Sequence, residues 1–125
     1  MLRQSILSAA LALGLCAPAW AVDCSATLTG GAAKKIISVP ANGRVPLFTI
    51  GNTDATTGGG EPVWISFSGD AVASAPSWPL AAPTSSTFAG LSTFTTPPNW
   101  KLNGGVSVIA ATTGHHVSCT IWGYE

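Results

Sequence analysis

The sequence predicts an all-β protein that forms a single small β-sandwich or jelly-roll-like barrel of about seven to eight strands. No segment shows the helical period of apolar residues. Short runs rich in Val, Ile, Thr and aromatic residues alternate instead with turns rich in Gly, Pro, Asn and Ser. The chain has 125 residues and no internal repeat, which is the size of one domain.

The first residues have the features of a secretory signal peptide. Arg3 provides a short positive region, residues 6–16 are apolar, and Ala19-Trp20-Ala21 is a small-x-small cleavage site. We therefore expect residues 1–21 to be a signal peptide and residues 22–125 to be the β-domain, exported to the periplasm, the extracellular space or a virion surface. The apolar run is shorter than a membrane span and Pro18 ends it, so no membrane association is expected after cleavage. The alternative is a retained hydrophobic N-terminal segment.

Cleavage would leave two cysteines, Cys24 and Cys119, near opposite ends of the mature chain. An oxidising compartment allows them to form a disulfide. In the chain-entropy model, a loop of this length contributes on the order of 4–5 kcal/mol. An intermolecular bridge between neighbouring subunits is the competing possibility. Two cysteines alone cannot complete a structural zinc site, and no metal or other cofactor is predicted.

Two strands show clear alternation. In residues 62–67, Val63, Ile65 and Phe67 share one face and Trp64 the other. In residues 117–124, the side chains of Val117, Cys119 and Ile121 are assigned to the core, while Ser118, Thr120, Trp122 and Tyr124 point the other way. Asn42-Gly43 is a strong hairpin signal. Residues 69–83 are expected to be irregular. Further strands are expected in residues 24–29, 34–39, 45–50, 86–95 (around Phe88 and Phe94) and 105–111.

The composition excludes two classes of protein. Only 8% of residues are charged, against roughly 25% in typical soluble domains, and the formal net charge is zero. Nucleic-acid binding is not expected, because the phosphate backbone requires clustered cations and only Lys34-Lys35 form even a pair. Intrinsic disorder is not expected, because 46% of residues are hydrophobic. A surface poor in charge suits a repeated assembly or a matrix; the alternative is a secreted domain solubilised by hydroxyl groups.

No catalytic arrangement is evident, and we expect the protein not to be an enzyme. Two alternatives are weaker: a glycosidase pair of Glu61 and Asp70, and a calcium site of Asp54 and Glu61. All three carboxylates are expected instead to be solvated turn residues, which is the usual role of such residues in loops. His115 and His116 are adjacent, so on a strand they would point to opposite faces. They are expected to be exposed residues flanking a hairpin turn.

Aromatic side chains are the candidate binding residues. Trp64 and Trp122 lie on the strand faces opposite the aliphatic ones, and Tyr124 follows on the Trp122 face. Together they would form an aromatic platform for carbohydrate or protein. The alternative is that both sheet faces are covered and these tryptophans belong to the core.

Three stretches carry a family resemblance: Pro-Val-Trp-Ile-Ser-Phe-Ser-Gly at 62–69, Trp-Pro-Leu-Ala-Ala-Pro at 78–83 and Gly-Val-Ser-Val-Ile-Ala-Ala at 105–111. With Leu-Phe-Thr-Ile-Gly-Asn at 47–52, the pattern resembles small β-sandwich proteins, many of them virion-associated, of tailed phages and prophages. It covers most of residues 34–121. The resemblance implies a non-enzymatic structural or decoration protein that contacts other subunits, either its own copies or capsid and tail proteins. The alternative is a secreted or periplasmic binding module that uses the aromatic platform.

Overall fold

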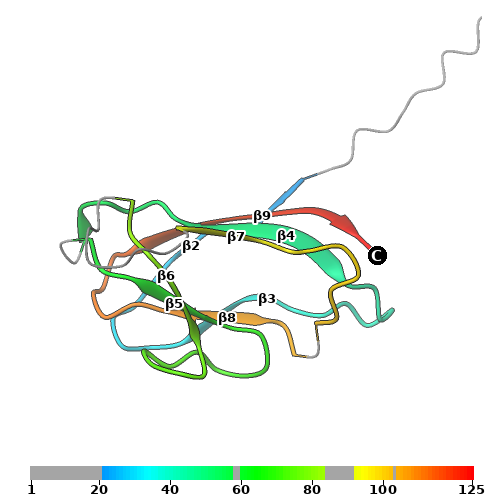
Figure 1. Ribbon diagram of the computed structural model, residues 1–125, viewed down its shortest axis with the longest axis horizontal. Coiled ribbons are helices and arrows are strands. Elements are labelled where there is room, and N and C mark those ends of the chain that lie inside the picture. Colours follow the sequence, from blue (N-terminus) through cyan, green and yellow to red (C-terminus); the bar gives the residue numbers. More distant parts are fainter. Residues whose placement is uncertain (1–20, 58–59, 84–91, 103) are drawn as a thin grey trace, which may run out of the picture.

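The computed structural model describes residues 21–57, 60–83, 92–102 and 104–125, and over these residues the chain is an all-β sandwich of two antiparallel sheets. Figure 1 shows the two layers packed face to face. The sheets are not closed, so the predicted sandwich is confirmed and the barrel is not formed. The described residues contain no helix long and apolar enough to cross a bilayer.

Each sheet has a simple strand order. The five-stranded sheet has the order β1-β9-β4-β7, and β2 also pairs with β9. The four-stranded sheet has the order β3-β8-β5-β6. The strands are β1 (Val22–Asp23), β2 (Ala26–Thr27), β3 (Lys34–Ile37), β4 (Pro46–Asn52), β5 (Val63–Ser66), β6 (Trp78–Leu80), β7 (Thr93–Thr95), β8 (Val106–Ile109) and β9 (His116–Tyr124).

The core lies between the long β4–β9 pair and the β5–β8 pair. Successive residues of β4 alternate between buried and less buried positions, with Phe48 and Ile50 both fully buried. Val117, Cys119 and Ile121 of β9 are buried beside them, as the alternation predicts. Val63, Ile65, Val106 and Val108 are the buried residues of the facing sheet. Removing this apolar surface from water is the main force holding the sheets together.

The outer face of the four-stranded sheet is also partly covered. Ser107 of β8 is 1% exposed, although it alternates with the core residues Val106 and Val108. Ala71 donates its backbone N–H to the Ser107 hydroxyl at 3.0 Å and is itself buried. The loop after β5 therefore folds back over this face, which explains why every residue of β8 is buried.

Two local predictions are wrong. Asn42-Gly43 does form a turn, with Gly43 at φ 72° and its N–H bonded to the Pro40 carbonyl. However, β3 and β4 belong to different sheets, so the turn connects the two sheets and is not a hairpin.

Residues 69–83, expected to be irregular, contain β6, which pairs with β5. Pro79 at its centre is tolerated because β6 is an edge strand. The strand expected around Phe94 is β7, whereas Phe88 lies outside the described residues.

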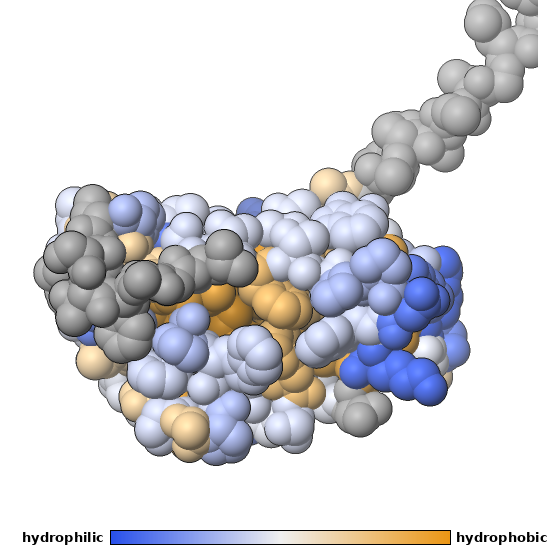
Figure 2. Space-filling view, in the orientation of Figure 1, coloured by the Kyte–Doolittle hydropathy of each residue, from blue (hydrophilic) through white to orange (hydrophobic). Residues whose placement is uncertain are grey.

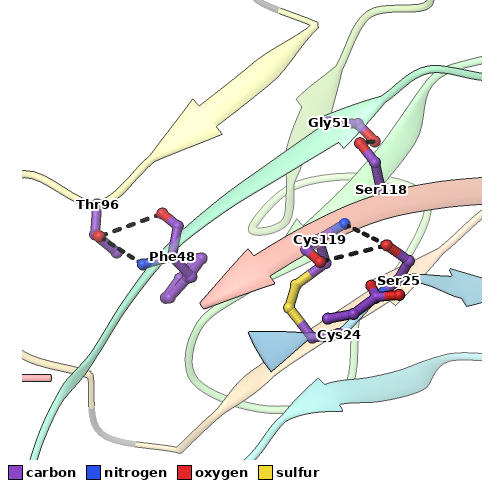
Figure 3. The surroundings of a disulfide bond; sticks show 8 residues. Cys24, Ser25, Phe48, Gly51, Thr96, Ser118 and Cys119 are labelled. Carbon is purple, nitrogen blue, oxygen red and sulfur yellow. Dashed lines mark hydrogen bonds between the residues drawn. A yellow bond between two sulfur atoms is a disulfide. The ribbon is translucent and has the colours of Figure 1, made fainter. Parts of the chain in front are cut away.

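The first strands are attached to the last strand by a disulfide between Cys24 and Cys119, whose Cα atoms are 4.7 Å apart (Figure 3). β1 and β2 both pair with β9 on either side of it. Cys24 N–H donates to the Cys119 carbonyl at 3.0 Å, and the Ser25 hydroxyl accepts from Cys119 N–H at 3.0 Å. The predicted pairing is confirmed as a bond within one chain, and it is compatible with an oxidising environment. The predicted signal peptide falls almost entirely outside the described residues.

Candidate functional site

The two tryptophans of the expected aromatic platform lie on opposite sides of the molecule. Trp64 sits in β5 between the buried core residues Val63 and Ile65, so it faces the outer side of the four-stranded sheet and is partly buried. Trp122 of β9 is 43% exposed on the outer side of the five-stranded sheet. Because the sheets pack core to core, the structure does not bring these two side chains together.

Trp122 is the extra residue of a β-bulge, and this bulge changes the face on which Tyr124 lies. Phe48 pairs with Ile121 and Leu47 pairs with Gly123, so Trp122 is the extra residue on β9. The bulge reverses the alternation, and Tyr124 is paired with the buried Pro46. The prediction that Tyr124 shares the Trp122 face is therefore wrong. Arg44 lies over the Tyr124 ring, 5.6 Å from its centroid, and donates to the Tyr124 carbonyl at 3.1 Å.

A different tryptophan, Trp78, is the most exposed large hydrophobic residue among the described positions. It pairs directly with Ile65, which is 1% exposed, so the two side chains share the core-facing side of the sheet. Leu80, two residues along the same strand, is 4% exposed. Trp78 is nevertheless 63% exposed, because β6 is the last strand of its sheet. A core-facing tryptophan is thus left uncovered at the open side of the sandwich.

Trp78 borders an apolar groove of about 250 Å³ between the two edge strands β6 and β7. Figure 2 shows hydrophobic residues reaching the surface between the two layers on this face. Phe94, on the inner side of β7, packs against Phe67 with ring centroids 4.9 Å apart, and both rings form part of the wall. The groove is lined by Ile65, Phe67, Trp78, Pro79, Leu80, Thr93 and Phe94, none of which is charged.

The opposite edge of the sandwich is closed. There the chain passes directly from β2 in one sheet to β3 in the other, over residues 28–33. Gly31 N–H donates to the Ala110 carbonyl at 2.9 Å, and the Lys34 ammonium donates to the Thr27 carbonyl at 3.3 Å. Leu28, within this crossing, is 2% exposed. Among the described residues, the apolar groove thus lies on the β6–β7 side, away from this closed edge.

A buried polar cluster lies at one end of the sandwich. His115 is fully buried, which corrects the prediction of an exposed turn histidine; only His116 is exposed. The His115 Nε2 atom lies 2.9 Å from the Asn52 Oδ1 atom, and its Nδ1 atom lies 3.3 Å from Glu61 Oε1. Glu61 also accepts from the Thr112 N–H at 2.9 Å and the Thr112 hydroxyl at 3.2 Å. These contacts join the end of β4, the residues just before β5 and the connection from β8 to β9, which crosses from one sheet to the other and is not the predicted hairpin.

The orientation of Asn52 determines the histidine tautomer. Its Nδ2 group donates to the Glu61 and Leu80 carbonyls at 3.0 and 3.1 Å, so its Oδ1 atom must be the group that faces the ring. His115 therefore carries a hydrogen on Nε2. Both ring nitrogens face protein groups and the ring has no exposed surface, so a substrate cannot reach it. Continuing the β9 alternation back from Val117 and Cys119 would have placed residue 115 inside.

The remaining carboxylates act locally. Asp54 accepts the Thr57, Thr56 and His116 backbone N–H groups, and these bonds, that from Thr57 first, hold the pKa of Asp54 well below its usual range. Asp70 is exposed, and no hydrogen bond or ion pair among the described residues joins it to Glu61. Within the same residues, no group of three His, Cys, Asp or Glu side chains is placed to hold a metal ion.

Comparison with family models, with curated proteins and with solved structures finds no match to this chain.

Proposed function

We propose that this protein is a non-enzymatic structural protein that acts outside the cytoplasm through contacts with other protein subunits, as an accessory or decoration component of a phage or prophage particle. The observation that carries the proposal is Trp78, a core-facing tryptophan left 63% exposed beside an apolar groove. The particle is the setting implied by the sequence resemblance described above.

The energetics favour a protein partner at this edge. A tryptophan buries about 150–250 Å², so covering the exposed part of Trp78 at about 25 cal/mol per Å² contributes on the order of 2–4 kcal/mol. Tryptophan anchors that enter apolar pockets are typical of the few residues that dominate protein–protein binding energy. The low content of charged residues, 8%, suits a surface that is covered in the working state.

A secreted or periplasmic binding module is the second candidate, and the exposure of Trp122 favours it. This side chain is 43% exposed on the outer side of the five-stranded sheet, next in alternation to the exposed Thr120. Trp64 lies on the other side of the sandwich, so such a module would use Trp122 as a single aromatic contact and not as part of a platform.

The test compares Trp78→Lys with Trp122→Lys, the same substitution at two exposed tryptophans. Mass spectrometry should find the wild-type protein in purified particles in many copies, and Trp78→Lys should reduce its incorporation by about tenfold or more, given the apolar area lost. Trp122→Lys should be incorporated normally. Recovery of the wild-type protein only in the culture supernatant would overturn the proposal. If Trp122→Lys alone abolished binding to a soluble carbohydrate or protein, the binding module would replace it.

A further inference from the structure

We infer that the β6–β7 edge is a homotypic interface, in which a second copy of this chain places its Trp78 against the groove and receives the first copy's Trp78 in return. This inference rests on the proposed function and names the partner that the open edge accepts.

One copy already carries both halves of such a contact. Trp78 projects from β6 with most of its surface uncovered, and the groove beside it is walled by Leu80, Phe94 and Phe67. A surface that carries a protruding apolar side chain next to an apolar groove is self-complementary under a two-fold axis. Each copy then supplies one side chain and one groove. The contact closes at two copies without requiring a second kind of surface.

The backbone of β7 supports the same pairing. β4 pairs with one side of β7, through Thr49–Thr95, Ile50–Phe94 and Gly51–Thr93, and β7 is the last strand of its sheet. β7 reads Thr-Phe-Thr and so carries no lysine, proline or bulge that would block pairing, and its length of three residues confines the pairing to a short segment. Antiparallel pairing of two β7 strands would join the five-stranded sheets and bring the two Phe94 side chains to one inner face.

The distribution of charge favours a second copy over a charged partner. No residue of β6, β7 or the groove is charged. Lys34 lies on the opposite edge, at β3, and Arg44 contacts Tyr124 at the end of β9. A charged partner would bury ionic groups against this apolar wall without compensation. A second copy presents the same uncharged edge, and the small formal net charge of the chain keeps repulsion between copies low.

The interface leaves the N-terminus accessible. The order β1-β9-β4-β7 places β1 at the far edge of the five-stranded sheet from β7. The Cys24–Cys119 disulfide is likewise on the β9 side, so neither processing nor oxidation interferes with pairing.

The experiment is sedimentation velocity of the oxidised protein, as the exporting cell processes it, over a concentration series. Wild-type protein should shift reversibly from monomer to dimer, and Trp78→Lys should weaken the association constant by tenfold or more, as expected for loss of an anchor residue. Trp122→Lys is the matched control and should dimerise like the wild type. Thr93→Lys, at an exposed position of the β7 edge, should also weaken pairing without entering the core. Far-ultraviolet circular dichroism confirms that each variant is folded.

The outcomes separate this inference from the proposed function. Wild-type protein that stays monomeric at every concentration overturns the homotypic interface, and if Trp78→Lys still lowers particle incorporation, the proposed function stands with a different partner. A Trp78-dependent dimer that is absent from particles overturns the proposed function and leaves the interface standing. Equal weakening by Trp78→Lys and Trp122→Lys, or dimerisation that neither Trp78→Lys nor Thr93→Lys affects, would place the contact elsewhere and refute the inference.

Discussion

At the scale of single residues, the two adjacent histidines provide the clearest test of the buried polar cluster. His115→Ala would leave Asn52 Oδ1 without its hydrogen bond beside a small cavity, while Thr112 would still donate to both oxygens of Glu61. We expect it to lower the free energy of unfolding by about 2–4 kcal/mol, from one lost buried hydrogen bond and lost packing. His116→Ala is the matched control and, because its side chain is exposed, should change stability by no more than about 0.5 kcal/mol. Urea unfolding measures both; equal effects of the two variants would contradict the assignment.

The lowered pKa of Asp54 leads to a prediction of how the stability of the protein depends on pH. Hydrogen bonds from Thr57, Thr56 and His116 lower the pKa of Asp54 from its ordinary value of 3.8. A lowered folded-state pKa means that the carboxylate contributes stability above the unfolded-state pKa, and that this contribution is lost as the pH falls through the folded-state pKa. The advantage of the wild type over Asp54→Asn should therefore be constant near neutral pH and shrink below about pH 4.

Thermal unfolding at a series of pH values checks this sign. Asp70→Asn, at an exposed carboxylate in the loop over β8, is the control for the general effect of removing a negative charge. A difference between wild type and Asp54→Asn that grows as the solution is acidified would show that the hydrogen bonds to Asp54 do not favour its charged form.

At the scale of strands, alternation was sufficient to predict which side chains of β5 and of the first part of β9 face the core. Val63 and Ile65 in β5, and Val117, Cys119 and Ile121 in β9, lie inside as expected. The bulge at Trp122 was not predictable, because a bulge is a property of two paired strands and the partner of β9 cannot be read from β9 alone. The same limit applies to the turn at Asn42-Gly43: its local chemistry predicts a reversal of the chain, but not which sheet the next strand joins.

The candidate site was the least predictable feature, for a related reason. Trp78 lies in a strand of three residues interrupted by Pro79, too short for a recognisable period. Trp78 faces the core and is exposed because it pairs with Ile65 on the last strand of a sheet. Strand order cannot be read from local sequence. The burial of His115 was predictable from the sequence, because residues 115, 117, 119 and 121 alternate along one strand and so share its buried face.

The disulfide gives a prediction at the scale of the strands it joins. It closes a loop with a sequence separation of 95 and holds the two-residue strands β1 and β2 against β9. Reduction should lower the free energy of unfolding by about 2–5 kcal/mol, mainly because the unfolded chain gains freedom. Amide hydrogen exchange should increase first in β1 and β2, while the β4–β9 and β5–β8 pairs remain protected.

Intact mass under non-reducing conditions provides the check on that bond. A monomer lighter than the dithiol form by two hydrogens supports the intramolecular disulfide. A covalent dimer that reducing agent converts to monomer would support the intermolecular alternative instead, and two free thiols would exclude both.

At the scale of the whole molecule, the sandwich is asymmetric. One edge is closed by a short crossing with backbone hydrogen bonds, and the other presents Trp78 and the groove between β6 and β7. The polar cluster around His115 lies at an end of the sandwich, where it ties loops from both sheets together. Among the described residues, the cluster reaches the groove only through the hydrogen bond from Asn52 to the Leu80 carbonyl, and none of its hydrogen bonds involves Trp78, so variants at Trp78 should affect association with little change in stability.

Processing of the N-terminus is the last prediction, and it concerns the chain as a whole. The small side chains of Ala19 and Ala21 suit a signal peptidase, so protein from an exporting cell should begin at Val22. Val22 opens β1 and pairs with Ile121, and Cys24 follows two residues later in the disulfide. A folded chain would hold the residues after the cleavage site in a sheet, where a peptidase that binds extended backbone has poor access. Cleavage should therefore precede closure of β1 onto β9.

N-terminal sequencing of the exported protein identifies the first residue directly. Ala21→Phe, which places a large side chain at the cleavage position, should leave an uncleaved precursor that pulse-chase labelling detects, whereas Ala10→Phe within the apolar region should be processed normally. Intact Met1 in the wild-type mature protein would show that the hydrophobic segment is retained.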